Sequence, residues 1–130
     1  MDQSQIDNLA RTWIAKVEAL IKNSLEPGSI EDIPNYDLEE MVDNDPENAW
    51  LVIDSARGMA QDDLMLANIA AGPLEDLLWL HGEKFIDRFE ELAKKDEHFA
   101  FLMTGVWARN KSGDIVARIN AISNFTKRHL

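Results

Sequence analysis

Hydrophobic side chains recur along this chain about every three to four residues, which is the spacing of one face of an α-helix. The first stretch shows the pattern most clearly, with apolar side chains at Ile6, Leu9, Trp13, Val17 and Leu20. No stretch alternates apolar and polar positions over the length of a strand. The pattern therefore predicts an all-α protein with no sheet of consequence.

Residues that start and stop helices divide this pattern into about six or seven short helices. Acidic side chains that can cap a helix start stand before several apolar stretches, at Asp37, at Asp45, at Asp62 or Asp63, and at Asp96. At Gly72-Pro73 we expect one helix to end and another to begin. Glycine readily adopts the left-handed backbone conformation that follows a helix end, and proline suits the first position of the next helix. We expect that next helix to end at His81-Gly82, and a further helix to close at Lys94-Lys95.

The length of 130 residues suits a single domain spanning residues 1–130. Short turns make consecutive helices reverse, so we expect a compact array of antiparallel helical hairpins. Stacking of these hairpins in the manner of a solenoid is one arrangement open to the chain. The predicted core consists of inward-facing apolar residues: Leu9, Trp13, Val17, Trp50, Ile53, Leu77, Leu78, Phe85, Phe89, Leu102, Val106 and Ile119.

The net charge of −11 is concentrated in one stretch of the chain. Residues 26–65 hold 12 acidic side chains against the single base Arg57, giving −11, whereas residues 1–25 and 66–130 are each neutral. Such a field repels phosphate backbones and anionic membranes, so we expect neither nucleic acid nor a membrane as a partner. It attracts a basic protein. The alternative is a solvated face that only maintains solubility.

Basic residues gather near the C-terminus, where only Asp114 opposes them. They are Arg109, Lys111, Arg118, Lys127 and Arg128. We expect them to pair with the acidic stretch, either within one chain or between two copies.

The predicted partner site lies in the acidic stretch and at one tryptophan. Its residues are Glu31, Asp32, Tyr36, Glu39, Glu40, Asp43 and Trp79. Trp79 is included because leucines already fill the inward positions of its helix, and an exposed tryptophan is typical of a binding anchor. Packing of Trp79 against a second layer of helices is the alternative.

Signatures of catalysis are absent from the sequence. The chain has no cysteine, no serine-nucleophile motif and no glycine-rich phosphate loop, and its three histidines lack the spacing of a zinc site. We therefore expect no catalytic residue, metal or cofactor, and favour a non-enzymatic module that binds a basic protein. An immunity or inhibitor protein is one version of this function. The alternative is a small metal-dependent or acid–base enzyme that uses Glu75, Asp76, His81 and Asp87.

The start of the sequence, MDQSQIDN, lacks the basic and apolar regions of a signal peptide. The absence of cysteine fits a reducing compartment. We therefore expect a cytoplasmic protein.

Three motifs resemble a family of small bacterial all-helical proteins of unknown function. They are Asp45-Pro46-Glu47 with Ala49-Trp50, then Ala71-Gly72-Pro73-Leu74-Glu75-Asp76-Leu77-Leu78, then His81-Gly82-Glu83 with Phe85-Ile86-Asp87. The resemblance covers most of residues 37–107. It implies a bacterial, mostly cytoplasmic, all-helical domain, and it assigns no catalytic residue.

Overall fold

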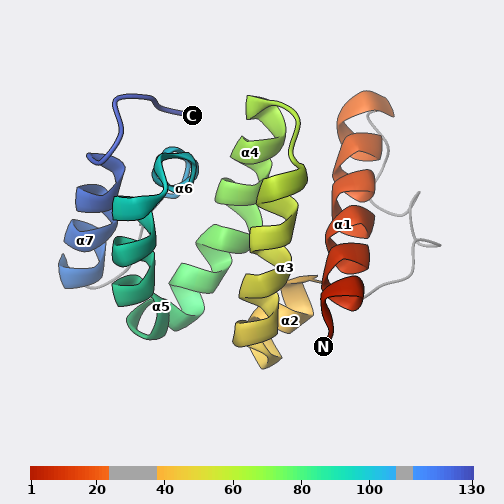
Figure 1. Cartoon of the computed structure of the whole chain (residues 1–130), viewed down its shortest axis with the longest axis horizontal. Helices are drawn as coiled ribbons and strands as arrows, with labels where there is room; N and C mark the ends of the chain where they lie inside the picture. Colours follow the sequence, from red (N-terminus) through yellow and green to blue (C-terminus); the bar gives the residue numbers. More distant parts are fainter. Residues whose placement is uncertain (24–37, 108–112) are drawn as a thin grey trace.

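A computed structural model describes residues 1–23, 38–107 and 113–130 of the chain. Every regular element within these ranges is a helix, which confirms the all-α prediction (Figure 1). The elements are α1 (Gln3–Asn23), α2 (Leu38–Asn44), α3 (Pro46–Met59), α4 (Asp63–Ile69), the π-helical turn η2 (Ala70–Leu74), α5 (Glu75–Lys95), α6 (Glu97–Met103) and α7 (Gly113–Ser123).

Three helices begin at the aspartates that the sequence marks as caps. The carboxylates of Asp45, Asp62 and Asp96 accept the backbone N–H three residues further on, at 3.5, 2.8 and 3.2 Å. These bonds satisfy donors that have no partner within the helix. Local chemistry thus sets the starts of α3, α4 and α6, whereas the predicted cap Asp37 lies outside the described residues.

The chain does not break at Gly72-Pro73, where we expected one helix to end and another to begin. It continues from α4 through η2 into α5, with helical backbone angles at Ala70 and Glu75. Gly72 does not adopt the left-handed conformation. Proline lacks the N–H of a regular turn and crowds the carbonyl before it, and the wider π turn accommodates both effects.

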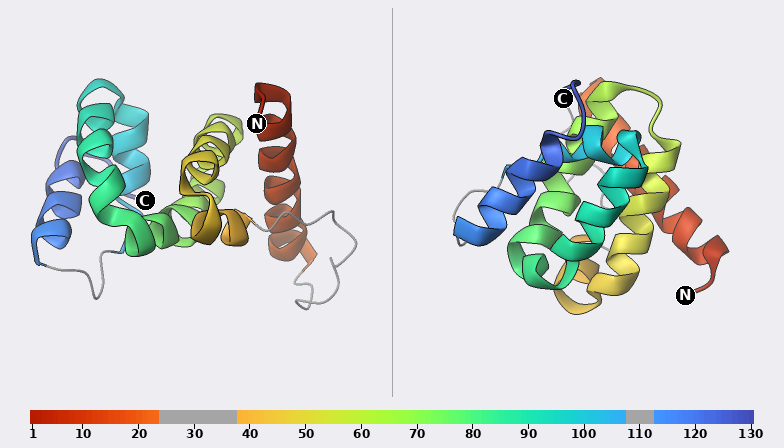
Figure 2. Two further views of the ribbon diagram at one scale, coloured as in Figure 1. Left: turned by 90° about the horizontal axis from the view of Figure 1, so that it is seen from below. Right: turned by 60° about the vertical axis from the view of Figure 1, so that its left-hand side comes forward.

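α5 consists of two helical stretches that meet at a kink at His81, where we expected the first stretch to end. The backbone of His81 is non-helical (φ −134°, ψ 27°), yet the helix resumes and closes at Lys95 (Figure 2). The His81 imidazole Nε2 donates to the carbonyl of Val42 at 2.7 Å. This bond ties the bend in α5 to α2.

Four aromatic rings at the centre of the core join α3, α5 and α6. The Phe89 ring centroid lies 4.7 Å from that of Trp50, 5.2 Å from Phe99 and 5.6 Å from Phe85. All four side chains are buried. Tilted and edge-on rings at these distances attract one another beyond the burial of their area.

Nine predicted core residues are buried, namely Trp50, Ile53, Leu77, Leu78, Phe85, Phe89, Leu102, Val106 and Ile119. The prediction is wrong for Leu9, Trp13 and Val17, which are only half-buried. Their helix, α1, lies at one end of the array and packs mainly on α3, while α7 lies at the other end (Figure 1). One neighbour cannot cover the whole apolar stripe of α1.

Helix directions follow the hairpin expectation only in part. α3 and α4 run antiparallel through a short turn, whereas α1 and α3 lie side by side in the same direction (Figures 1 and 2). α2 stands between α1 and α3 in the sequence, so these two neighbours are not joined by one tight turn. None of the helices in the described residues combines the length and the apolar composition of a bilayer-spanning segment.

We predict that Phe89→Ala lowers the free energy of unfolding by roughly 3–5 kcal/mol, because it leaves a cavity among three rings. Urea denaturation measures this loss. Phe125→Ala is the matched control, because Phe125 is 43% exposed; it should cost less than about 1 kcal/mol. Equal losses in the two variants would contradict the central place of Phe89.

We also predict opposite effects of the same substitution at two glycines. A Cβ atom on Gly105 would lie 2.8 Å from the Cβ of Ala70, so Gly105→Ala should cost about 1–3 kcal/mol. A Cβ atom on Gly58 in α3 meets no atom within 4 Å, so Gly58→Ala should stabilise by up to about 1 kcal/mol. Thermal unfolding that shifts in the same direction for both variants would refute this packing.

Candidate functional site

α2 presents three acidic side chains to solvent, Glu39, Glu40 and Asp43, which we call the α2 acidic face. Its opposite side buries apolar residues in the core. Within the described part of the chain, none of the three carboxylates forms an ion pair. These are three of the predicted partner residues, whereas Glu31, Asp32 and Tyr36 lie outside the described residues.

Arginines neutralise many carboxylates elsewhere on the molecule. The pairs are Arg57 with Asp54 at 2.7 Å and Asp96 at 2.8 Å, Arg88 with Glu47 at 2.7 Å, Arg118 with Glu90 at 2.6 Å and with Asp87, and Arg128 with Glu97 at 2.6 Å. We expected Arg118 and Arg128 to pair with the acidic stretch at residues 26–65. They pair instead with acids of the C-terminal half. Arg109 and Lys111 lie outside the described residues.

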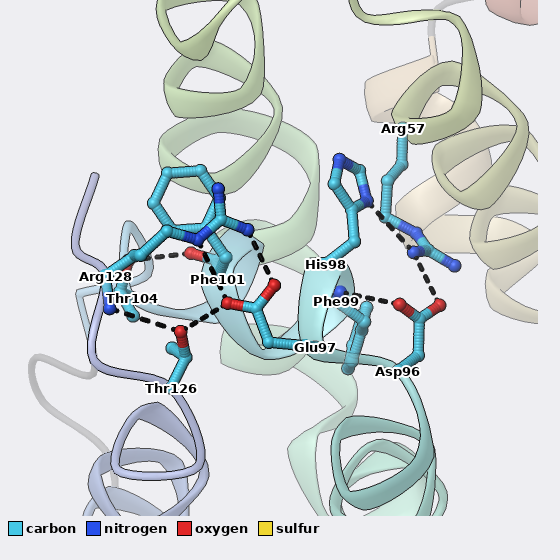
Figure 3. A network of polar contacts seen from close by, with 9 residues as sticks. All are labelled: Arg57, Asp96, Glu97, His98, Phe99, Phe101, Thr104, Thr126 and Arg128. Atoms are coloured by element: carbon cyan, nitrogen blue, oxygen red, sulfur yellow. Dashed lines mark hydrogen bonds and ion pairs between the residues drawn. The ribbon is translucent and has the colours of Figure 1, made fainter.

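One of these networks fastens the C-terminal segment to the start of α6 (Figure 3). The Glu97 carboxylate accepts from Arg128 Nη2 and Nε at 2.6 and 3.0 Å, and from the Thr126 hydroxyl at 2.6 Å. The hydrogen bonds from Arg128 and then Thr126 lower the pKa of Glu97 from 4.5 to about 2. The Arg128 guanidinium also lies 4.1 Å from the Phe101 ring centroid.

A second network fastens α3 to α6 through Arg57 (Figure 3). Arg57 Nη1 donates to Asp96 Oδ2 at 2.8 Å and lies 3.2 Å from His98 Nδ1. A guanidinium only donates, so His98 Nδ1 accepts in this contact. Burial raises the pKa of Asp96, but the hydrogen bond and charge of Arg57 outweigh it and lower that pKa overall.

Three of the four residues of the alternative enzyme site bind different parts of the fold. Glu75 accepts the backbone N–H of Trp107 at 2.8 Å, His81 binds α2, and Asp87 pairs with α7. Each of these side chains therefore joins α5 to a different part of the fold. Within the described residues, no group of three or more histidine, aspartate or glutamate side chains is placed to hold a metal ion.

A cleft of about 210 Å³ lies beside the α2 acidic face, between α1, α2, α4, η2 and the start of α5. Among the residues that the structure describes, its polar lining consists of Lys16, Glu39, Asn68 and Asp76, and its apolar lining includes Trp13, Val17, Leu20, Leu38 and Pro73. Of the predicted partner residues that the structure describes, only Glu39 is among these lining residues. The sequence offers no signal for the other lining residues, because five separate elements bring them together.

Two tryptophans are exposed away from this cleft. Trp79 on α5 is 42% exposed and does not line the cleft. Trp107 is 74% exposed, and the sequence analysis did not single it out as a binding residue. The residues next to a tryptophan in the sequence do not reveal whether it is exposed, so the exposure of Trp107 is seen only in the folded structure.

Comparison with known protein families finds a match to the family of unknown function DUF6869 over residues 31–126. The chain belongs to the DUF6869 family. The match spans α2 to α7 and includes the motifs at residues 71–87, which confirms the predicted membership of a family of unknown function. No curated protein and no solved structure matches the chain.

In this DUF6869 chain, α1 lies outside the matched range, yet it supplies one wall of the cleft. Ile6 and Ala10 fix the first half of α1 on the array, and both are buried. Trp13, Val17 and Leu20 are half-buried and face the cleft. The candidate site therefore combines the family domain with a helix that precedes it.

The Glu97 network of the DUF6869 domain predicts a pH-dependent stability. A carboxylate whose pKa is lowered by folding stabilises the native state above pH 4.5, and this contribution is lost as the pH falls toward 2. We expect the difference in unfolding free energy between wild type and Glu97→Gln to shrink over this range. Arg128→Gln should behave in the same way, because Arg128 provides the main hydrogen bonds. Urea denaturation at several pH values measures both, and a difference that does not change with pH would contradict the network.

Proposed function

We propose that this DUF6869 domain is a non-enzymatic module that binds a basic protein through the α2 acidic face. The observation that supports this function most strongly is the sorting of charge on the molecule. Arginines of the chain neutralise many acids of α3, α5 and α6, whereas Glu39, Glu40 and Asp43 form no ion pair within the described residues. Unpaired carboxylates on one face are available to a cationic partner.

The strength of the local field supports the same function. Residues 38–65 are all described and carry eight acidic side chains against Arg57, which gives a net charge of −7. Charge of one sign on one part of a surface orients a cationic partner during approach and speeds association. Carboxylates at the rim of an interface remain solvated after the partner has bound, so their desolvation cost is small.

An immunity or inhibitor protein for a basic toxin is one version of this proposal, and a cytoplasmic location is part of it. A toxin gene beside the gene for this chain would favour that version. No observation favours the enzyme alternative, because Glu75, His81 and Asp87 serve contacts between α5 and its neighbours.

We predict that neutralising the α2 acidic face weakens capture of the basic partner. The variant is Glu39→Gln/Glu40→Gln/Asp43→Asn, compared with wild type in affinity capture from cell extract, with the bound proteins identified by mass spectrometry. A protein of high isoelectric point that wild type retains and the variant loses is the expected result. With that protein purified, the association rate should fall at least about tenfold for the variant at low salt.

The matched control removes the same three charges elsewhere on the surface, in Glu83→Gln/Glu91→Gln/Asp114→Asn. These side chains are exposed and lie on α5 and α7. The control should retain the partner, with an association rate within about threefold of wild type. Equal association rates for the two triple variants would show that the rate depends on the net charge of the protein and not on where the charge lies. The α2 acidic face would then be a solvated surface and not a binding site.

A further inference from the structure

We propose that the cleft beside the α2 acidic face receives a single arginine side chain from the basic partner. This inference rests on the proposed function and names the chemical group that the partner inserts. The cleft adjoins the acidic face directly, because Glu39 belongs to both. A partner drawn to the acidic face would therefore meet the cleft at its edge.

The size of the cleft favours one side chain over a cofactor or a larger metabolite. Its volume is about 210 Å³. Pockets that hold drug-sized molecules have roughly 300–1,000 Å³. A single long side chain of a docked protein fits the smaller space and leaves the rest of that protein outside.

The apolar lining suits the stem and the flat end of an arginine. Val17, Leu38 and Pro73 line the cleft and can contact the three methylene groups of the stem. Trp13 lines it too, and its indole is half-buried. A guanidinium stacks on an indole face more favourably than an ammonium does, and it is also less strongly hydrated.

The polar lining offers hydrogen-bond acceptors to a ligand that has only donors. Glu39 forms no ion pair within the described residues. The Asn68 side-chain amide already donates from Nδ2 to the carbonyl of Leu64 at 2.8 Å, which leaves its Oδ1 as an acceptor. A guanidinium has five N–H donors in a planar fork that matches a carboxylate.

The net charge of the lining also favours a cationic ligand. Lys16 and Asp76 carry opposite charges, and both have contacts besides their place in the lining. Glu39 adds one negative charge, so the four polar side chains sum to −1. A cationic group neutralises this sum, whereas an anionic ligand would face Glu39 and Asp76 together.

The test measures binding of three small probes to the full chain by NMR. They are N-acetyl-arginine amide, its uncharged analogue N-acetyl-citrulline amide, and N-acetyl-lysine amide. The arginine probe should shift the Trp13 indole N–H resonance in a saturable way. It should bind at least about fivefold more tightly than the citrulline probe and at least about twofold more tightly than the lysine probe.

Two single variants locate the site within α2. Glu39→Gln removes a carboxylate that lines the cleft, whereas Glu40→Gln removes its exposed neighbour, which does not. The first should weaken the arginine probe at least about fivefold, and the second should change its affinity less than about twofold. Both substitutions lie on the exposed side of α2, so neither removes a core side chain.

Several outcomes would overturn the inference. They are the absence of a saturable Trp13 shift, equal effects of the two variants, and binding of the citrulline or lysine probe as tight as that of arginine. If any of these occurs while the α2 triple variant still slows association of the basic partner, the cleft assignment fails and the proposed function stands. If the triple variant has no effect on that association, the proposed function fails independently of the probes.

Discussion

The packing of Phe89 against Trp50, Phe85 and Phe99 joins the three helices on which the other described helices depend. Trp50 belongs to α3, Phe85 and Phe89 to α5, and Phe99 to α6. α1 packs on α3, α2 packs on α3 and α5, and α7 packs on α5 and α6. Each large aromatic ring buries more apolar area than most other side chains, and burial of apolar area is the main favourable contribution to folding. Loss of one ring would therefore loosen the supports of both ends of the array.

The bent segment from α4 through α5 gives this array its shape. A straight helix from Asp63 to Lys95 would run in a single direction from end to end. The π turn around Pro73 and the bend at His81 redirect it twice, so that the start of α5 borders the cleft while its second half packs on α6 and α7 (Figure 2). The hydrogen bond from His81 to Val42 fixes α2 against the bend. The position of the acidic face relative to the cleft thus depends on an irregular turn in a distant part of the sequence.

Arginines pair with carboxylates of α3, α5 and α6, whereas the three carboxylates of α2 form no ion pair within the described residues. A uniform excess of acid would repel itself everywhere and would give a partner no orientation. Here Arg118 and Arg128 neutralise carboxylates of the C-terminal half, and Arg57 serves one carboxylate in α3 and another at the start of α6. Most of these pairs are exposed enough that each contributes little to stability. Their larger effect is on the distribution of charge, which leaves α2 as an exposed acidic face.

The sequence by itself determined the features that depend on neighbours within one helical turn. Periodic apolar positions predicted the all-α class, and aspartate caps predicted the starts of α3, α4 and α6, because a capping bond spans only three residues. Charge counting likewise pointed to Glu39, Glu40 and Asp43. Only the tertiary structure decided that the helix continues through Gly72-Pro73 instead of ending there, since a local signal cannot tell a kink from a stop. It also decided that Trp13 is half-buried at a cleft, and that Asn68 and Pro73 meet Glu39 there. Those properties arise from contacts between elements far apart in the chain, and no single stretch of sequence contains them.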